Sequence, residues 1–190
     1  MSLKNDGLGL LKSRDEAAFE QFIREHQENV YRIVFSVVGN EQDAQDLAQE
    51  VFIKIYLSIS SFRGNSALST WVYRIAYNTA LDHHKKQRRR PVVRSMDTDE
   101  DLETLYLKSA KDGSPEERFS EEQIRKDISD ALAMLPDEQR QVVMLRDVYG
   151  FSYEQITVMT GLKSGTLKSR LSRGRSGVKN ILIKMWNNPT

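Results

Sequence analysis

The sequence predicts an all-α fold in which two small helical domains are joined by a flexible linker. Apolar residues recur every three or four positions along most of the 190 residues, whereas the alternation typical of β-strands is absent. Residues 93–116 interrupt this pattern with a change from basic to acidic side chains and with Gly113-Ser114-Pro115. We therefore expect a first domain over residues 1–92, an acidic linker over 93–116 and a second domain over 117–190.

The first domain is predicted to contain three long helices. Apolar side chains follow the 3.6-residue period between residues 19 and 37, and Gly39-Asn40 is expected to end that helix and to cap the next one. A second apolar stripe covers residues 44–55, and the polar segment 60–66 is typical of a loop. The third helix is expected to run from about residue 67 into the basic segment before Pro91.

The second domain consists of shorter helical segments. Apolar stripes cover residues 124–135 and 142–148, and Ser152 is suited to cap a short helix that follows them. A last helix is expected over residues 164–176. The chain breaks between these segments fall at Pro136, Gly150 and Gly161.

The composition is that of an ordinary soluble protein, with 39% hydrophobic and 29% charged residues. The chain has no cysteine, which excludes disulfides, cysteine-based zinc sites and a thiol redox switch. Its three histidines are too few and too badly placed for a metal cluster, so we expect no metal and no cofactor. Neither a membrane span nor a signal peptide is evident, and we expect a cytoplasmic protein that does not insert into membranes.

The net charge of +1 conceals blocks of opposite sign. Residues 155–190 contain seven bases and no acid, and a second basic run covers residues 85–94. Acids cluster in the linker between residues 97 and 103, and four acids without a base occupy residues 41–50. Each block taken alone could be a solvated face, but the segregation favours several partners of different charge.

The segment FSYEQITVMTGLKSGTLKSRLSRGR, residues 151–175, predicts a helix-turn-helix. Leu167, Leu171 and Val178 fall on one side of the last helix, and the opposite side is small, polar and basic. Such a helix suits the major groove of DNA, since serines allow close approach and an arginine can pair with guanine. Gly174 and Gly177 each cost up to about 1 kcal/mol relative to alanine, so this helix is expected to fray late or to be ordered by DNA.

The segment SFRGNSALSTWVYRIAYNTALDHHKKQRRR, residues 61–90, combines aromatic and basic side chains. Aromatics beside arginine and asparagine can form a stacking platform for unpaired bases, and the loop 61–65 could frame a flipped base. The alternative is that Phe62, Trp71, Tyr73 and Tyr77 pack in the core, which their helical spacing alone favours.

Three segments in this order resemble a bacterial RNA polymerase sigma factor of the small extracytoplasmic-function group of the sigma-70 family. DAQDLAQEVFIKIY, residues 43–56, is similar to the polymerase-binding helix of that family. Residues 61–89 resemble its strand-melting and downstream-element region, often called region 2, and LPDEQRQVVMLRDVYGFSYEQI with GTLKSRLSRGR resembles its upstream-element reader in region 4. The resemblance covers nearly the whole chain.

The resemblance implies a promoter-specificity subunit without catalytic activity, cofactor or small-molecule substrate. Its partners would be core RNA polymerase, promoter DNA as duplex and as non-template single strand, and an anti-sigma factor, often membrane-bound. The regulon would serve a stress or envelope response. The acidic linker would pass near the RNA exit path of the polymerase.

The resemblance also assigns roles to residues. Core polymerase would be bound by Asp43, Asp46, Gln49 and Glu50. The downstream element and the melted strand would be bound by Phe62, Arg63, Gly64, Asn65, Trp71, Tyr73, Arg74, Asn78, Lys85, Lys86, Arg88 and Arg89. The upstream element would be read by Thr166, Lys168, Ser169, Arg170, Ser172, Arg173 and Arg175. The chain departs from the family pattern at Gln155, Leu167 and Gly174, which leaves the upstream consensus open.

Two other functions are compatible with parts of the sequence. A stand-alone helix-turn-helix regulator would bind a palindromic duplex without polymerase, but it leaves the acidic helix and the aromatic segment unexplained. A metal-dependent nuclease would need Asp97, Asp99 and Asp101, which lie in the predicted linker without a scaffold.

Overall fold

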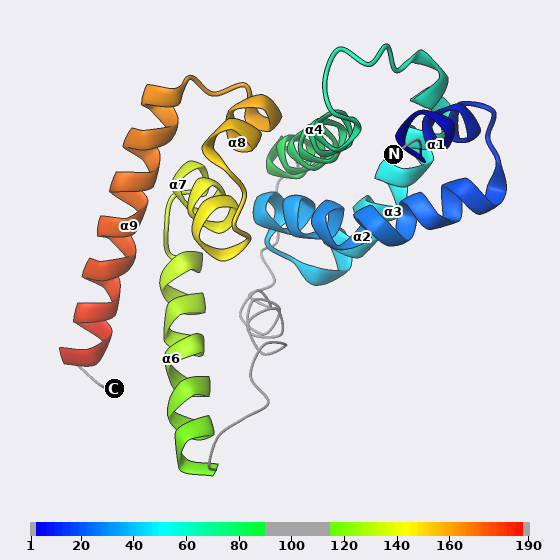
Figure 1. Ribbon diagram of the computed structural model, residues 1–190. Coiled ribbons are helices and arrows are strands. Elements are labelled where there is room, and N and C mark those ends of the chain that lie inside the picture. Colours follow the sequence, from blue (N-terminus) through cyan, green and yellow to red (C-terminus); the bar gives the residue numbers. More distant parts are fainter. Residues whose placement is uncertain (1–2, 90–114, 188–190) are drawn as a thin grey trace.

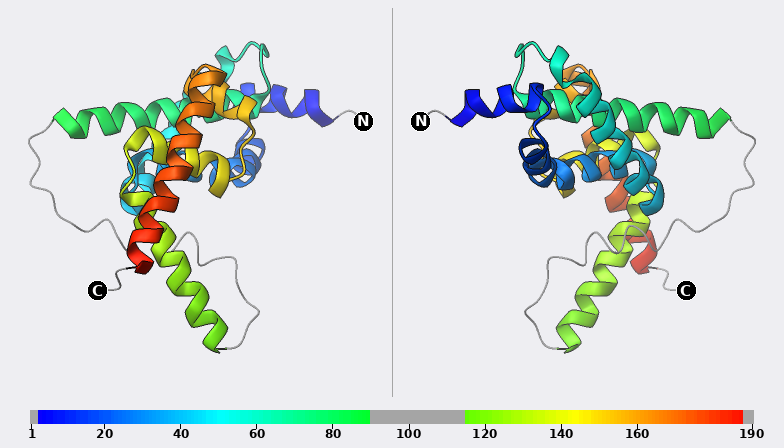
Figure 2. Two further views of the ribbon diagram at one scale, coloured as in Figure 1. Left: turned by 90° about the vertical axis from the view of Figure 1, so that its left-hand side faces the viewer. Right: turned by 90° about the vertical axis from the view of Figure 1, so that its right-hand side faces the viewer.

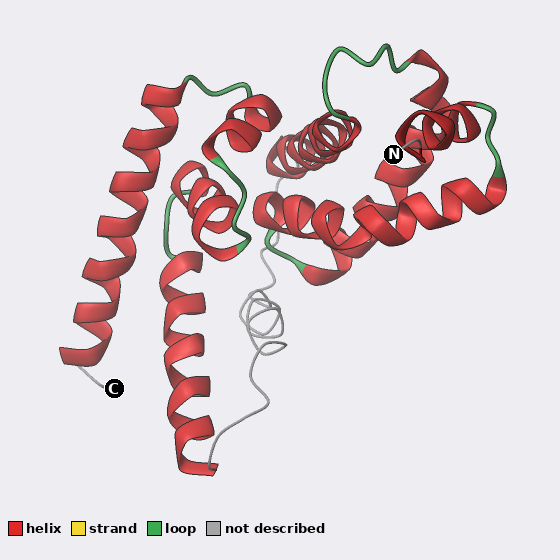
Figure 3. Cartoon of the chain, in the orientation of Figure 1, coloured by secondary structure: helices red, strands yellow, loops and turns green. Residues whose placement is uncertain are grey.

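The computed structural model describes residues 3–89 and 115–187, and within these ranges the chain is helical with connecting turns and no strand (Figures 1 and 3). The first domain contains α1 (Leu3–Lys12), α2 (Glu16–Val38), α3 (Glu41–Ser58), the short helix η1 (Ile59–Ser61) and α4 (Leu68–Arg89). The second contains α6 (Pro115–Ala133), α7 (Asp137–Val143), η2 (Met144–Val148), α8 (Tyr153–Thr160) and α9 (Ser164–Asn187). The predicted all-α class is confirmed. Most of the predicted linker, residues 93–114, lies outside the described residues, and the exact domain boundaries stay a prediction.

The predicted helix boundaries of the first domain follow from local capping. Gly39 ends α2 with a left-handed backbone, φ 71°, which glycine adopts without strain. The Asn40 side chain then accepts a hydrogen bond of 2.9 Å from the backbone N–H of Asp43 and so caps α3. These two residues reverse the chain between α2 and α3.

The core of the first domain lies between α2, α3 and α4. α2 contributes the fully buried residues Val30, Ile33 and Val34, and α3 contributes Val51 and Ile55. The predicted inner face of α4 is buried at Val72 and Thr79 and partly buried at Leu68 and Ile75. Burial of these side chains is the main stabilising contribution to this domain.

The second domain depends on a close approach of α9 to α7. A Cβ atom at Gly174 would lie 2.6 Å from Val143 Cγ2, and one at Gly177 would lie 2.6 Å from Leu135 Cδ2. Gly174 therefore admits α7, and Gly177 admits the turn between α6 and α7, at distances where a larger residue would force a neighbour to move. α9 extends beyond the predicted end at residue 176: it continues to Asn187 and packs along α6 and α7. The late fraying or ordering by DNA stays a prediction.

Three local features depart from the sequence expectations. α1 was not predicted, because its sequence contains two glycines. In the structure, Leu8 and Leu11 pack it against the core. α6 begins at Pro115, earlier than expected, with proline in the first helical position that it favours. η2 is a π-helical turn in which the Tyr149 N–H donates to the Met144 carbonyl over 2.9 Å.

The two domains pack against each other rather than standing apart (Figures 1 and 2). α4 lies beside α8, and α2 lies beside α7 and η2. α9 contacts the C-terminal half of α6, and the two helices cross at an angle and extend away from the first domain (Figure 2). Among the described helices, none has the length and the apolar character that would be needed to cross a membrane.

Candidate nucleic-acid and protein interfaces

The helix-turn-helix is formed by α8 and α9. The Ser152 hydroxyl accepts a 3.1 Å hydrogen bond from the Gln155 backbone N–H, while the Gln155 side chain accepts one of 2.8 Å from the Ser152 N–H. This capping box fixes the start of α8. Gly161, with φ 72°, turns the chain between α8 and α9. The side chains of Leu167 and Leu171 are buried and hold α9 against the rest of the domain. The recognition helix is thus held on its apolar side.

The outward side of α9 presents the predicted upstream-element residues. Thr166, Lys168, Ser172 and Arg173 are exposed, and Ser169 is half-buried. The Arg173 guanidinium donates to the Ser169 hydroxyl over 3.3 Å, one helical turn away. A small polar surface with protruding bases is therefore available to DNA along this face.

Two predicted DNA contacts already have acidic partners in their own domain. Arg170 lies 2.6 Å from a Glu138 carboxylate oxygen on α7. Arg175 donates two hydrogen bonds of 2.8 and 2.6 Å to Asp147 on η2, which raises the pKa of the guanidinium well above its ordinary value. These pairs brace α9 against the rest of the domain. To contact a phosphate, either arginine must be shared with its acid or released from it.

The segment predicted to bind the melted strand divides into a buried and an exposed set. Phe62 and Tyr73 are only 5% and 6% exposed, so neither ring is available to DNA in this arrangement. Phe62 packs against Trp71, with ring centroids 5.3 Å apart, and Asn29 donates a 2.9 Å hydrogen bond to the Tyr73 hydroxyl. For these two rings, the core-packing alternative describes the observed environment.

Of the remaining predicted strand contacts, Trp71 is partly buried against the core, and those on the loop and along α4 as far as Lys86 are exposed. Arg74 and Asn78 are exposed one turn apart on α4, and the loop residues Arg63, Gly64 and Asn65 are exposed beside it. Gly64 has φ 75°, a conformation that favours glycine in this loop. Lys85 and Lys86 extend the exposed basic surface along α4, and Arg88 and Arg89 fall in its last turn. The structure therefore places a polar loop before the N-terminus of α4, Arg74 and Asn78 in the first half of that helix, and the bases near its C-terminal end.

The acidic surface of α3 is narrower than expected. Asp46, Gln49 and Glu50 are exposed, and Glu50 pairs with Lys54 at 2.7 Å. Asp43 is half-buried instead and accepts a 3.0 Å hydrogen bond from Gln87 on α4. Asp43 therefore ties α3 to α4, which the sequence alone did not indicate.

Sequence reasoning missed two apolar residues next to these acids. Ile53 and Leu57 are 60% and 62% exposed, although they belong to the apolar half of α3. They follow Asp46 and Glu50 by seven residues each, which places them on the same face of the helix. That spacing was the signal available in the sequence. We call the surface of Asp46, Gln49, Glu50, Ile53 and Leu57 the α3 outer face.

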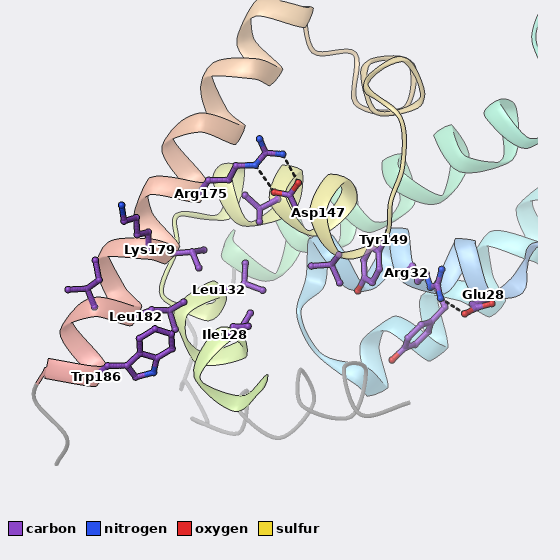
Figure 4. Close-up of a pocket in the computed structure, with 15 residues that line it drawn as sticks. Glu28, Arg32, Ile128, Leu132, Asp147, Tyr149, Arg175, Lys179, Leu182 and Trp186 are labelled. Atoms are coloured by element: carbon purple, nitrogen blue, oxygen red, sulfur yellow. Dashed lines mark hydrogen bonds and ion pairs between the residues drawn. The ribbon is translucent and has the colours of Figure 1, made fainter. Parts of the chain in front are cut away.

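A groove of about 1000 Å³ lies between the domains (Figure 4). Its apolar wall is built by α6 and α9, including Ile128, Leu132 and Leu182, and its other wall contains Tyr149 and Arg32. The Arg175–Asp147 pair lies at its rim (Figure 4). Trp186 is 55% exposed at one end, where its indole N–H donates to Asp127 over 2.6 Å. No sequence pattern pointed to this groove, because both domains contribute to it.

The residues described by the structure contain no group of three or more metal-ligating side chains. Asp97, Asp99 and Asp101, on which the nuclease hypothesis depended, lie outside the described residues.

Comparison with known proteins agrees with this division into two domains. Residues 22–90 match the family model of sigma-70 region 2, and residues 125–176 match that of sigma-70 region 4. RNA polymerase sigma-H factor of Pseudomonas aeruginosa is 36% identical over 170 residues, which cover 88% of each chain. ECF RNA polymerase sigma-E factor of Escherichia coli K12 is 35% identical, covering 87% of each chain. ECF sigma factor SigE of Mycolicibacterium smegmatis is also 35% identical, but the match spans 65% of its length.

Solved structures show the same fold. The sigma factor RpoE of Bartonella quintana, in complex with the anti-sigma factor NepR, superposes with a TM-score of 0.63 at 26% identity and covers 86% of this chain and 96% of its own. CnrH in complex with the cytosolic domain of CnrY gives a TM-score of 0.64 at 18% identity, covering 94% of this chain and 96% of its own.

Proposed function

The chain belongs to the extracytoplasmic-function group of the sigma-70 family and is an alternative sigma factor, and we propose how its surfaces divide that work. The observation that carries the proposal is the presence, on one chain, of an acidic and apolar outer face on α3 and of basic polar faces on α4 and α9. Acids repel phosphate, so the first surface suits a protein and the others suit DNA.

The α3 outer face binds a basic surface of core RNA polymerase. Asp46 and Glu50 supply charge complementary to that surface. Ile53 and Leu57 supply apolar surface that becomes buried on binding. Apolar area next to charged groups is typical of a specific protein interface. The subunit itself carries out no chemistry; it places the polymerase at a promoter.

The two basic faces bind two promoter elements. Arg173 and its neighbours on α9 read the upstream element as duplex in the major groove. Arg74, Asn78 and the loop 63–65 bind the downstream element and the melted non-template strand, with the basic end of α4 on the adjacent backbone. The factor acts in the cytoplasm, and its regulon serves a stress or envelope response.

An anti-sigma factor restrains the chain by occupying the groove between the domains. The solved RpoE structure with which this chain aligns over 86% of its length contains an anti-sigma factor. The apolar wall of α6 and α9 fits the apolar side of a helix, and charged groups at the rim, including Lys179, fit its polar side. The restraining partner need not resemble DNA, because the groove is apolar.

Three variants separate the proposed steps in an assay with core polymerase and a cognate promoter. Asp46→Arg is expected to lower polymerase association, measured by polarisation of the labelled chain, whereas the same charge change at the exposed Glu20 on α2 is not. Arg173→Ala is expected to weaken upstream binding by about 1–3 kcal/mol, with Lys184→Ala in the last turn of α9 as its control.

The third variant tests the melted strand. Asn78→Ala is expected to leave upstream binding intact and to reduce open-complex formation, measured by permanganate reactivity of unpaired thymines. Equal loss of every step in all three variants would contradict this division of labour. Tight binding to a palindromic duplex without polymerase would instead identify a stand-alone regulator.

A further inference from the structure

One residue in the turn between α1 and α2 has an unusual backbone conformation. Arg14 has φ 62°, and it is the only residue other than glycine with a positive φ among those that the structure describes. Its N–H donates to the Leu11 carbonyl over 3.1 Å, and the Asp15 carboxylate then caps α2 by accepting a 2.8 Å hydrogen bond from the Ala18 N–H. Glycine adopts this left-handed conformation without strain, whereas a residue with a side chain is strained. The turn alone therefore does not account for an arginine at this position.

The Arg14 side chain lies over an aromatic ring of α3. Its guanidinium carbon is 5.1 Å from the centroid of the Tyr56 ring, within the range of a cation–π contact. The Phe19 ring meets the same ring edge-on, with centroids 5.0 Å apart, and so holds Tyr56 in place. Arg14 is exposed, and within residues 3–89 and 115–187 no carboxylate forms an ion pair with its guanidinium. The stack therefore presents a positive charge to solvent.

This stack continues the α3 outer face. Tyr56 follows Gln49 of that face by seven residues, or about two helical turns, so the two side chains lie on nearly the same line along α3. α1 packs against η1, the short helix that follows α3, which brings the turn after α1 to this end of the face. Tyr56 is 36% exposed, so part of its surface is available to a partner.

The charge along this extended surface changes sign. Asp46 and Glu50 lie toward the middle of α3, whereas Arg14 lies at its C-terminal end. The helix rises about 15 Å between Asp46 and Tyr56, at about 1.5 Å per residue. Lys54, the one base within α3, is paired with Glu50 at 2.7 Å. A surface with opposite charges in different places binds its partner in one orientation and disfavours the reverse.

We propose that Arg14, held over Tyr56, is a specificity-determining residue of the polymerase-binding surface and pairs there with a carboxylate of core RNA polymerase. The acids of the α3 outer face meet basic groups of the polymerase and Arg14 meets an acid beside them, which fixes the orientation of α3 on its partner. Arg14 lies outside residues 22–90, so the match to sigma-70 region 2 does not assign it this role. The inference rests on the proposed binding of polymerase by the α3 outer face.

Arg14→Gly tests the proposal, because it removes the side chain and relieves the backbone at the same time. Each full-length variant competes with labelled native chain for core polymerase, and its melting temperature is measured separately. Arg14→Gly is expected to compete about tenfold less well. Its melting temperature is expected to stay close to the native value, because glycine fits φ 62° without strain. Arg24→Ala, which removes an exposed arginine from α2, is the control and is expected to compete like the native chain.

Two outcomes of this competition would overturn the proposal. The first is native competition by Arg14→Gly. The second is weak competition accompanied by a clearly lower melting temperature, which would assign Arg14 a structural role in the turn. Arg14→Lys keeps the charge and is expected to compete to within about threefold of the native chain.

A charge reversal separates a specific ion pair from general attraction. If Arg14 only added to the overall field, Arg14→Glu would strengthen binding to a basic polymerase surface. The proposal expects the opposite: Arg14→Glu should bind more weakly than Arg14→Gly, because two carboxylates then face each other. Binding of Arg14→Glu at or above the native strength would contradict the pair.

Asp46→Arg in the same competition distinguishes this inference from the proposed function. If Asp46→Arg weakens binding and the Arg14 variants do not, the inference about Arg14 fails while the α3 outer face keeps its proposed role. If Asp46→Arg competes like the native chain, the proposed role of the α3 outer face fails and this inference fails with it.

Discussion

At the scale of single residues, the packing of the second domain depends on a glycine in α9. Gly174 lies in the middle of α9, where helix propensity disfavours glycine, yet Val143 Cγ2 would lie only 2.6 Å from a Cβ atom added there. Propensity alone therefore suggested a weak helix, and packing reverses that conclusion. Because the Val143 side chain is short and branched, it has little freedom to move aside.

Gly174→Ala is accordingly expected to destabilise the chain by about 1–3 kcal/mol despite the better helix propensity of alanine. Gly165→Ala is the matched control on the same helix, because nothing lies within 4 Å of its added methyl group. The control is expected to be neutral or to stabilise by up to about 1 kcal/mol. Urea unfolding monitored by circular dichroism measures both. Similar midpoints for the two variants would show that α9 does not depend on this contact.

His26 is a second residue whose role follows from its surroundings. Its ring packs against Phe22, with centroids 4.6 Å apart, and its buried Nδ1 has no hydrogen-bond partner among the described residues. Burial lowers the pKa of His26, with the nearby Glu25 acting in the opposite direction. The folded chain therefore resists protonation of this ring more than the unfolded chain does.

The stability of the chain is expected to fall as the pH drops through the ordinary histidine range. In this range the unfolded state binds more protons, because the pKa of His26 is about 6.5 in the unfolded chain and lower in the folded chain. Thermal unfolding at about pH 7.5 and about pH 5.5 measures the loss. His26→Gln is expected to reduce the difference between the two conditions. An unchanged pH dependence in that variant would assign the acid sensitivity to other groups.

At the scale of elements, local signals predicted most helices, and partner surfaces explain the exceptions. The Gly39-Asn40 and Ser152-Gln155 caps could be recognised because each acts within four residues. α1 contains two glycines and could not be predicted from its own sequence; it packs against α2 and η1. The outward Ile53 and the inward Asp43 were likewise decided by the packing of α3 against α4.

Replacing Ile53 and Leu57 together with alanine is expected to weaken core polymerase binding by about tenfold or more. Both side chains are largely exposed in the free chain, so the melting temperature should change little. Met134→Ala, which shortens an exposed apolar residue in the other domain, serves as the control for surface hydrophobicity. Wild-type affinity of the double variant in a binding titration would remove the apolar half of the α3 outer face from the interface.

At the scale of the whole molecule, the sequence predicted two domains with different partners but contained no signal for their arrangement. The contacts at Phe151, Gln141 and Asp137 join segments 53 to 78 residues away from their partners on α4, beyond the reach of periodicity or capping. The groove between the domains was missed for the same reason. The predicted site residue Tyr73 consequently packs against Phe151 of the second domain as well as contacting Asn29 of its own.

We propose that this chain directs core RNA polymerase to promoters through two separate DNA-binding faces. Transcription by core polymerase from a library of randomised promoters, with sequencing of transcript 5′ ends, tests it most directly. With the chain present, we expect transcripts from templates that share two short sequence blocks at a fixed spacing, the upstream block being lost in Arg173→Ala. A library in which the chain enriches no template above core polymerase alone would contradict the account.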